Sequence, residues 1–254
     1  MFFDTHAHLQ WKSFDKDRDL VIKRAKKEDV FNIVNVGFDI DNCYKAINLA
    51  TQNKGLYATV GLHPHNASQL NEKTLKVLRT LSKNPFVVGI GEIGLDYYRL
   101  LSPKEVQKQA FETQLILASE QNLPVVIHNR EAESDILITL SKFKGKIKGI
   151  MHCFSGDIAF AKKSIQLGFL ISFAGPITYS KSYNLHDIAK WIDLKDVLIE
   201  TDCPWLAPHS VRGKRNEPSY LPRIANKIAD LKKLTRNEVG ETTTENAKRI
   251  FNLE

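Results

Sequence analysis

Two histidines and an aspartate stand close together near the start of the chain, in the segment DTHAHL at residues 4 to 9. His6 and His8 are two positions apart, so on an extended strand both imidazoles point to the same side. Two imidazoles that converge on one point can share a metal ion. An isolated pair is equally well explained as two solvated histidines near a terminus, so its meaning depends on the rest of the chain.

Four more side chains of metal-ligand type stand at the ends of short apolar segments. They are Glu92 in GEIGLD, His128 in VIHNR, His152 in IMHCF and Asp202 in IETDCP. Because an unpaired ionisable group is costly to bury, the repeated pairing of an apolar segment with such a residue indicates one shared site. Six ligands exceed the three protein ligands of a catalytic mononuclear zinc, so we expect two divalent ions, Zn²⁺, Mg²⁺ or Mn²⁺.

Glu92 is the expected bridging ligand, because each oxygen of a carboxylate can bind one ion. His6 and His8 would then bind one ion, and His128 and His152 the other. A pair of ions acidifies a bridging water toward neutrality and stabilises both the attacking and the leaving oxygen of a displacement. This chemistry is that of a hydrolase.

Asp202 has a second expected role besides binding an ion. At the end of the last apolar segment it is placed to orient or deprotonate the attacking water as a general base. A plain helix N-cap is the alternative interpretation, and Pro204 two residues later weakens it. Asp202 and Glu92 are therefore the predicted catalytic residues.

Basic side chains gather after the last apolar segment, where Arg212, Lys214 and Arg215 surround Gly213 in the segment at residues 209 to 222. Arginine suits phosphate oxygens because it donates paired hydrogen bonds. We therefore expect this segment to bind a phosphorylated or polyanionic substrate. A solvated basic loop is the alternative.

Two further residues are expected to contact the substrate. Arg130, two residues after His128, is placed to project from its strand end, although an ion pair with Glu131 or Glu133 explains it as well. His63, in GLHPH, is expected to reach the substrate or to lie just behind the metal ligands.

The elements that carry these residues alternate along the chain. Eight short β-type apolar segments are predicted at residues 1–6, 30–37, 56–63, 87–94, 124–130, 148–154, 169–175 and 196–202. Segments with helical spacing separate them, and Thr235 with Glu238 forms a capping box before the last helix. Eight such units in about 250 residues predict an α/β fold, a (β/α)8 TIM barrel forming a single domain over residues 1–254. An open doubly wound sheet has the same alternation, but it gathers its functional residues at one crevice.

The composition is that of a globular enzyme, with 43% hydrophobic and 26% charged residues. The net charge of +7 is compatible with a polyanionic substrate and also with a lysine-rich surface. Cys43, Cys153 and Cys203 have no CxxC spacing, so free thiols and a reducing compartment are expected. Without a signal peptide or a long apolar run, we expect a cytoplasmic protein with no membrane association and no obligate protein partner.

Together, DTHAHL, GLHPH, GEIGLDYY, VIHNREA, MHCFSG, SFAGPITY, ETDCPWLAP and RGKRNEPSYL closely resemble the TatD family of metal-dependent deoxyribonucleases, within the amidohydrolase-like TIM barrels. The resemblance implies a (β/α)8 barrel, two divalent cations and hydrolysis of phosphodiester bonds in DNA, often from the 3′ end. It places the metal ligands of the family at the six positions assigned above. Cys203 and Trp205 stand where the family commonly has a small residue and a tyrosine, and we expect this to bear on the shape of the rim and the substrate preference but not on the chemistry.

The leading hypothesis is a deoxyribonuclease of the 3′-5′ exonuclease type, in which a metal-bound hydroxide attacks phosphorus. The substrate is expected to be DNA, with RNA or tRNA as alternatives. A D-aminoacyl-tRNA deacylase, or another ester or amide hydrolase, is the alternative on the same barrel. A nucleic-acid-binding protein without activity is the third hypothesis, and the six intact ligand positions disfavour it.

Overall fold

A computed structural model describes residues 1–253 of the chain, and in them eight parallel strands alternate with α-helices. The strands are β1 (Phe2–Ala7), β2 (Val30–Val36), β3 (Leu56–Val60), β4 (Val87–Asp96), β5 (Val125–Arg130), β6 (Gly149–Met151), β7 (Phe169–Phe173) and β8 (Val197–Ile199). The helices are α1 (Arg18–Lys27), α2 (Ile40–Gln52), α3 (Glu72–Leu81), α4 (Lys104–Gln121), α5 (Glu133–Ser141), α6 (Ile158–Gln166), α7 (Tyr183–Trp191), α8 (Leu221–Lys232) and α9 (Arg236–Phe251). Within residues 1–253, no helix has both the length and the apolar character needed to cross a bilayer.

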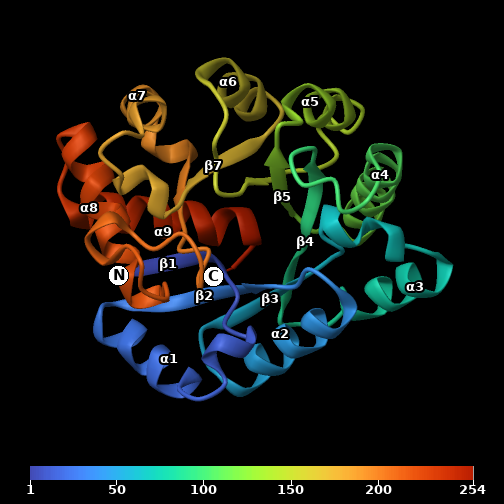
Figure 1. The fold of residues 1–254 in the computed structure, drawn as a ribbon, viewed down its shortest axis with the longest axis horizontal. Coiled ribbons are helices and arrows are strands. Elements are labelled where there is room, and N and C mark those ends of the chain that lie inside the picture. Colours follow the sequence, from blue (N-terminus) through green and yellow to red (C-terminus); the bar gives the residue numbers. More distant parts are fainter. Residues whose placement is uncertain (254) are drawn as a thin grey trace.

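Each strand pairs in parallel with the next one along the chain, from β1 to β8. The ring closes just beyond β8, where the amide of His8 donates to the carbonyl of Cys203 (2.9 Å) and the amide of Asp202 donates to the carbonyl of His6 (2.9 Å). Figure 1 shows the strands around the centre with the helices outside them. The predicted single-domain (β/α)8 barrel is therefore confirmed. The open doubly wound alternative is wrong, because its strand order would reverse at a switch point.

Apolar side chains and α9 fill the N-terminal end of the barrel. Phe3 of β1 stacks on Phe251 of α9, with ring centroids 6.1 Å apart, and Val88 and Val126 belong to the same buried cluster. In Figure 1, α9 crosses behind the ring of strands. The predicted capping box starts this helix, since the Thr235 and Glu238 side chains each accept the other's backbone amide. With one end filled by hydrocarbon, the polar side chains of the strands gather at the C-terminal end.

Several predicted strand ends are wrong, and the backbone explains why. The strands predicted to end at residues 154 and 202 end at Met151 and Ile199, where their pairing with β7 stops, and Cys153 (φ 43°) and Asp202 (φ 53°) beyond them are not extended. The fourth strand is longer than predicted, since its pairing with β5 continues to Asp96. An apolar run shows where a strand is buried but not where its ladder of hydrogen bonds stops.

Substituting Gly94 is expected to destabilise the barrel beside the site. Gly94 has a φ of 140°, and a Cβ there would lie 2.0 Å from the carbonyl oxygen of His128. Gly94→Ala combines backbone strain with steric overlap and is expected to lower the free energy of unfolding by about 4 kcal/mol, measured by urea unfolding. Gly145→Ala is the matched control, because Gly145 also has a positive φ but faces open space, and it should cost about 1 kcal/mol. Equal losses would contradict the steric argument.

Candidate metal centre

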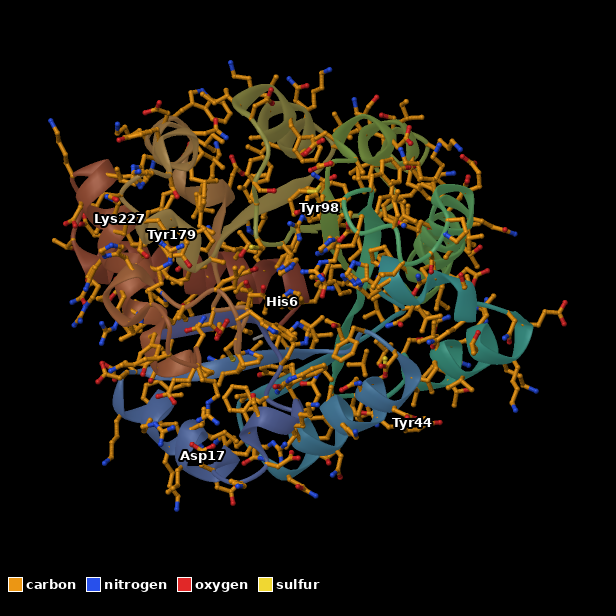
Figure 2. The ribbon with its side chains drawn as sticks, in the orientation of Figure 1. His6, Asp17, Tyr44, Tyr98, Tyr179 and Lys227 are labelled. Carbon is orange, nitrogen blue, oxygen red and sulfur yellow. The ribbon has the colours of Figure 1, made fainter. Side chains whose placement is uncertain are left out.

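The six side chains predicted as metal ligands meet at the C-terminal mouth of the barrel. Figure 2 places His6 near the centre of the ring of strands. Backbone contacts continue past the strand ends to position two of them: the amide of His152 donates to the carbonyl of Ile127 (3.0 Å), and that of Asp202 donates to the carbonyl of His6. Glu92 and His128 lie within β4 and β5 rather than at their last residues.

Glu92 lies between two groups of imidazoles. Its Oε2 atom is 3.5 Å from Nε2 of His6 and 3.9 Å from Nε2 of His8. Its Oε1 atom is 2.9 Å from Nδ1 of His128 and 3.4 Å from Nε2 of His152. Each carboxylate oxygen therefore faces a different pair of histidines.

Asp202 joins the side of the cluster formed by His6 and His8. Its Oδ1 atom is 3.8 Å from Nε2 of His6 and 3.6 Å from Nε2 of His8, and these two nitrogens are 3.0 Å apart. The ring of His6 also stacks on that of His152, with centroids 3.6 Å apart. Donor atoms from β1, β4 and the segments after β6 and β8 thus converge within a few ångströms.

The hydrogen bonds behind two histidines decide which ring nitrogen faces the site. Nδ1 of His8 lies 2.9 Å from the carbonyl oxygen of Val36, and Nδ1 of His152 lies 2.6 Å from Oε1 of Glu200. Because both partners accept hydrogen bonds, Nδ1 carries the proton of the neutral ring, and Nε2 is then the nitrogen that can offer a lone pair to a metal ion. Partners of this kind hold metal-binding histidines in the correct tautomer. The donor set therefore fits a divalent cation that accepts imidazole and carboxylate ligands.

His128 has the opposite arrangement. Its Nε2 atom is 3.3 Å from Oδ2 of Asp96, which also lies 2.8 Å from Nε2 of His65. Asp96 therefore holds the far side of the ring, and Nδ1 faces Glu92. In the neutral ring the lone pair that points to the site is on Nδ1.

His63 also reaches the cluster, with Nε2 3.4 Å from Oε1 of Glu92. Its Nδ1 atom accepts the backbone amide of His65 (3.1 Å), so in the neutral ring the proton is on Nε2. Burial lowers the pKa of His63 to about 4, which keeps the ring neutral at pH 7. Its geometry is therefore that of a hydrogen-bond donor and not of a metal ligand.

Neighbouring charges and hydrogen bonds shift the pKa values of the cluster in the direction opposite to burial. Burial by itself would raise the pKa of Glu92, but the surrounding imidazoles, His63 and His152 foremost, hold that pKa well below its usual range. Burial would lower the pKa of His152, but the charges of Glu200 and Glu92 raise it to about 10. Burial by itself would raise the pKa of Asp202, but the neighbouring imidazoles of His8, His152 and His6 lower it.

The basic side chains predicted to bind substrate have different partners. Arg215 forms a two-pronged ion pair with Asp17 (2.8 and 2.7 Å), which lowers the pKa of that carboxyl to about 2. Arg24 binds Glu217 in the same way (2.9 and 2.6 Å). These contacts tie the loop after β8 to α1, so the guanidinium of Arg215 is already engaged. Lys214 is exposed and forms no ion pair with any side chain of residues 1–253.

Two other arginines lie over aromatic rings. The guanidinium of Arg130 is 3.9 Å from the ring centroid of Tyr98, and that of Arg212 is 4.8 Å from the ring centroid of Tyr179. Figure 2 places Tyr98 near the end of β4 and Tyr179 beyond β7. Across the described part of the chain Arg130 forms no ion pair, so the alternative pairing with a neighbouring glutamate is not observed.

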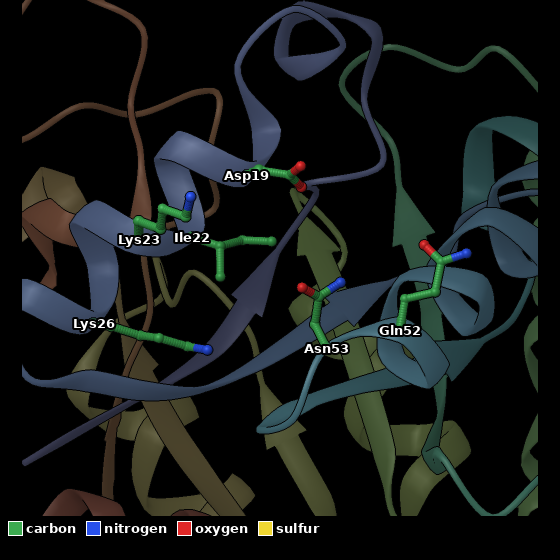
Figure 3. Close-up of a pocket in the computed structure, with 6 residues that line it drawn as sticks. All are labelled: Asp19, Ile22, Lys23, Lys26, Gln52 and Asn53. Carbon is green, nitrogen blue, oxygen red and sulfur yellow. The ribbon is translucent and has the colours of Figure 1, made fainter.

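A surface hollow of about 360 Å³ lies between α1 and the end of α2, lined by Asp19, Ile22, Lys23, Lys26, Gln52 and Asn53 (Figure 3). None of the predicted site residues lines it. The hollow is therefore separate from the predicted metal centre.

The whole described chain matches a known family. A family model described as TatD related DNase matches residues 3–252. The chain belongs to this TatD family. The "uncharacterized metal-dependent hydrolase YabD" of Bacillus subtilis is 45% identical over the full length of both chains. The "3'-5' ssDNA/RNA exonuclease TatD" of Erwinia tasmaniensis is 37% identical and covers 99% of this chain and 100% of its own.

Solved structures agree with this membership. The crystal structure of YJJV, a TatD homologue from Escherichia coli, superposes with a TM-score of 0.93 at 28% sequence identity, covering 100% of this chain and 98% of that one. The chain is a metal-dependent hydrolase of the TatD family, with histidine, glutamate and aspartate groups in its barrel mouth that are suited to bind metal.

Sequence reasoning missed two carboxylates of this TatD centre, Glu200 and Asp96. Both are buried and each holds a histidine ring in place, His152 and His128 respectively. The signal that identified Glu92 was also present here, since an acidic residue ends each apolar run. The three cysteines of the chain are free thiols, as predicted.

Glu200→Gln is expected to weaken metal binding without removing a proposed ligand. The amide keeps the shape of the side chain but loses the charge that orients His152, so affinity for Zn²⁺ should fall about 10- to 100-fold in a competition titration with a chromophoric chelator. Glu241→Gln, an exposed position on α9, is the matched control. Unchanged affinity in Glu200→Gln would show that His152 needs no charged partner.

Metal binding is also expected to release protons and to strengthen as pH rises. Because the pKa of His152 is raised to about 10, its ring carries a second proton below that pH. A metal ion must displace this second proton in order to bind the ring. Apparent Zn²⁺ affinity should therefore increase from pH 6 to pH 9, measured by the same titration together with proton release into a weak buffer. A pH-independent affinity would contradict this assignment.

Proposed function

We propose that this TatD-family chain is a nuclease that removes nucleotides from the 3′ end of single-stranded DNA, with RNA as a further substrate. The observation that carries the proposal is the position of Glu92, each of whose oxygens faces a different pair of histidines. A carboxylate placed in this way suits a two-metal phosphodiesterase. The Erwinia tasmaniensis relative, a protein named as a 3'-5' ssDNA/RNA exonuclease, supports the substrate and the direction of digestion.

The proposed ligands divide into two sets around Glu92. His6, His8 and Asp202 would hold one divalent ion with Oε2 of Glu92, and His128 and His152 would hold the other with Oε1. When bound, two such ions activate water and stabilise the attacking and leaving oxygens of the displacement. Zn²⁺, Mn²⁺ and Mg²⁺ are the candidate ions, and the imidazole-rich set favours the first two.

Two side chains are proposed to take part in the reaction, one through the attacking water and one through the phosphate. Asp202 is ionised at neutral pH, because its pKa is lowered, so it can accept the proton of an attacking water as general base. His63 is neutral and directs Nε2 toward the site, so it can donate a hydrogen bond to a phosphate oxygen.

Basic side chains at the mouth are proposed to bind the phosphates that flank the reacting one. Arg130, Arg212 and Lys214 are not engaged in ion pairs within residues 1–253, so their charges are free to meet a polyanion. Arg215 has a different proposed role, because its charge is matched by Asp17. It shapes the basic loop rather than binding substrate.

The second candidate, a D-aminoacyl-tRNA deacylase, uses the same residues to direct water at a carbonyl carbon. The names of the relatives do not favour it. Comparing nucleotide release with D-amino acid release from a D-aminoacyl-tRNA, under one metal and one pH, separates the two. Faster release of the amino acid would overturn the nuclease proposal.

Purified protein with Mg²⁺, Mn²⁺ or Zn²⁺ is expected to shorten a 5′-labelled single-stranded oligonucleotide into a ladder from its 3′ end. Asp202→Asn should lower kcat about 10³-fold, because the proposed general base is lost. Asp187→Asn, an exposed residue of α7, is the control and should retain full activity. A metal-loaded protein that leaves both DNA and RNA intact would rule out the proposal.

Arginine substitutions should separate substrate binding from loop stability. Arg212→Ala is expected to raise KM about fivefold and to reduce the salt slope of oligonucleotide binding by about one, because one phosphate contact is lost. Arg215→Ala should instead lower the free energy of unfolding by about 1 kcal/mol, a small loss because the ion pair with Asp17 is partly exposed to solvent. The salt slope should stay unchanged. If the two variants behaved alike, the division of roles would be wrong.

A further inference from the structure

An aromatic cluster lies directly beside the proposed metal ligand His8. The ring of Trp205 is 5.3 Å from that of His8 and meets it edge to face at 68°. Trp11 packs 5.3 Å from Trp205, and Phe38 contacts both Trp11 (5.6 Å) and His8 (5.5 Å). The cluster therefore joins segments after β1, β2 and β8 and continues the wall of the metal centre outward.

Trp205 is the most exposed ring of this aromatic cluster, with 43% of its surface accessible, whereas Trp11 and Phe38 are partly buried behind it. Its backbone is nevertheless fixed. The amide of Trp205 donates to the carbonyl of Asp202 (3.0 Å), and its carbonyl accepts from the fully buried side chain of Asn216 (2.7 Å). A rigid, solvent-facing indole next to a metal ligand is a preformed surface for a flat ligand.

The charge around this surface indicates the kind of flat ligand. Arg212 and Lys214 belong to the loop that follows Trp205, and Arg130 lies over Tyr98 on the other side of the site. A ligand that offers both an aromatic face and negative charge is a nucleobase attached to its phosphate. An unpaired base suits this surface better than a paired one, because a base in a duplex must also lose its pairing before it can turn onto the ring.

We propose that Trp205, backed by Trp11 and Phe38, stacks on an unpaired base adjacent to the phosphate that is cleaved, and that this contact selects single strands. The inference rests on the proposed nuclease function and names a specificity residue for it. A base stacked on this ring is held beside His8 and Asp202, so its own phosphate is brought to the metal centre. A duplex end would have to open before it could make the contact.

The test compares two substrates that differ only in their bases. One is a short single-stranded oligothymidylate, and the other has the same backbone with abasic sites at its 3′-terminal nucleotides. Wild-type protein is expected to cleave the oligothymidylate with a kcat/KM about tenfold higher, the usual effect of one stacked base. Trp205→Ala should lose this preference and act on the abasic strand as the wild type does.

Two variants control for folding and for nonspecific effects. Trp205→Tyr keeps an aromatic face and should retain most of the preference. Trp191→Ala removes an indole of similar exposure from α7 and should leave both rates unchanged. If Trp205→Ala lowered both rates equally while Trp205→Tyr restored them, the residue would support only His8, and the stacking proposal would be overturned.

Binding without turnover separates the two proposals. In a Glu92→Gln background, oligothymidylate is expected to quench the indole fluorescence, and the quenching should disappear in Glu92→Gln/Trp205→Ala but not in Glu92→Gln/Trp191→Ala. Cleavage with no base preference in the wild type would overturn stacking and leave the nuclease function standing. Quenching that depends on Trp205, in a wild type that cleaves neither strand, would overturn the nuclease function alone.

Discussion

The buried charge of Glu92 is the constraint around which this barrel is organised. A carboxylate removed from water is costly unless opposite charge and hydrogen-bond donors surround it. Imidazoles from four other strands or strand ends supply that environment, and none of them is close to Glu92 in the sequence. Assembly of the site therefore depends on closure of the barrel, because an open sheet would separate β1, which carries His6, from β4, which carries Glu92.

The two ends of the barrel differ in the side chains that fill them. Apolar side chains and α9 fill the N-terminal end, where Phe3 and Phe251 stack. At the C-terminal end the hydrogen bonds between β1 and the chain after β8 close the ring, and buried Asp4 reinforces them by accepting from the amide and hydroxyl of Thr201 (2.9 and 2.6 Å). Asp4 thus links β1 to the segment after β8, and its oxygens are engaged there.

The basic side chains around the mouth of the barrel have different partners, and we propose different roles for them. The ion pairs of Arg215 with Asp17 and of Arg24 with Glu217 hold the loop after β8 against α1. That rigidity leaves Arg212 over an aromatic ring and Trp205 fixed beside His8. Charge and aromatic surface thus lie in neighbouring segments of the mouth, which is the combination used by proteins that bind single-stranded nucleic acids and the one on which the stacking proposal rests.

The sequence by itself determined the alternation of strands and helices, and with it the barrel, because hydrophobic periodicity is a local property of the chain. It also identified His6, His8 and Glu92 as residues of one site, since ionisable groups at the ends of apolar segments need partners. Only the tertiary structure decided which ring nitrogens face inward, because that depends on distant acceptors such as Val36 and Glu200.

The ion pair between Arg215 and Asp17 could likewise not be predicted from the sequence, because the two residues lie 198 positions apart. The ends of β6 and β8 depended on where their pairing with β7 stops, for which an apolar run carries no signal. Local patterns thus predicted which residue types gather at the mouth. Their orientation, pairing and protonation followed from contacts that exist only once the barrel has closed.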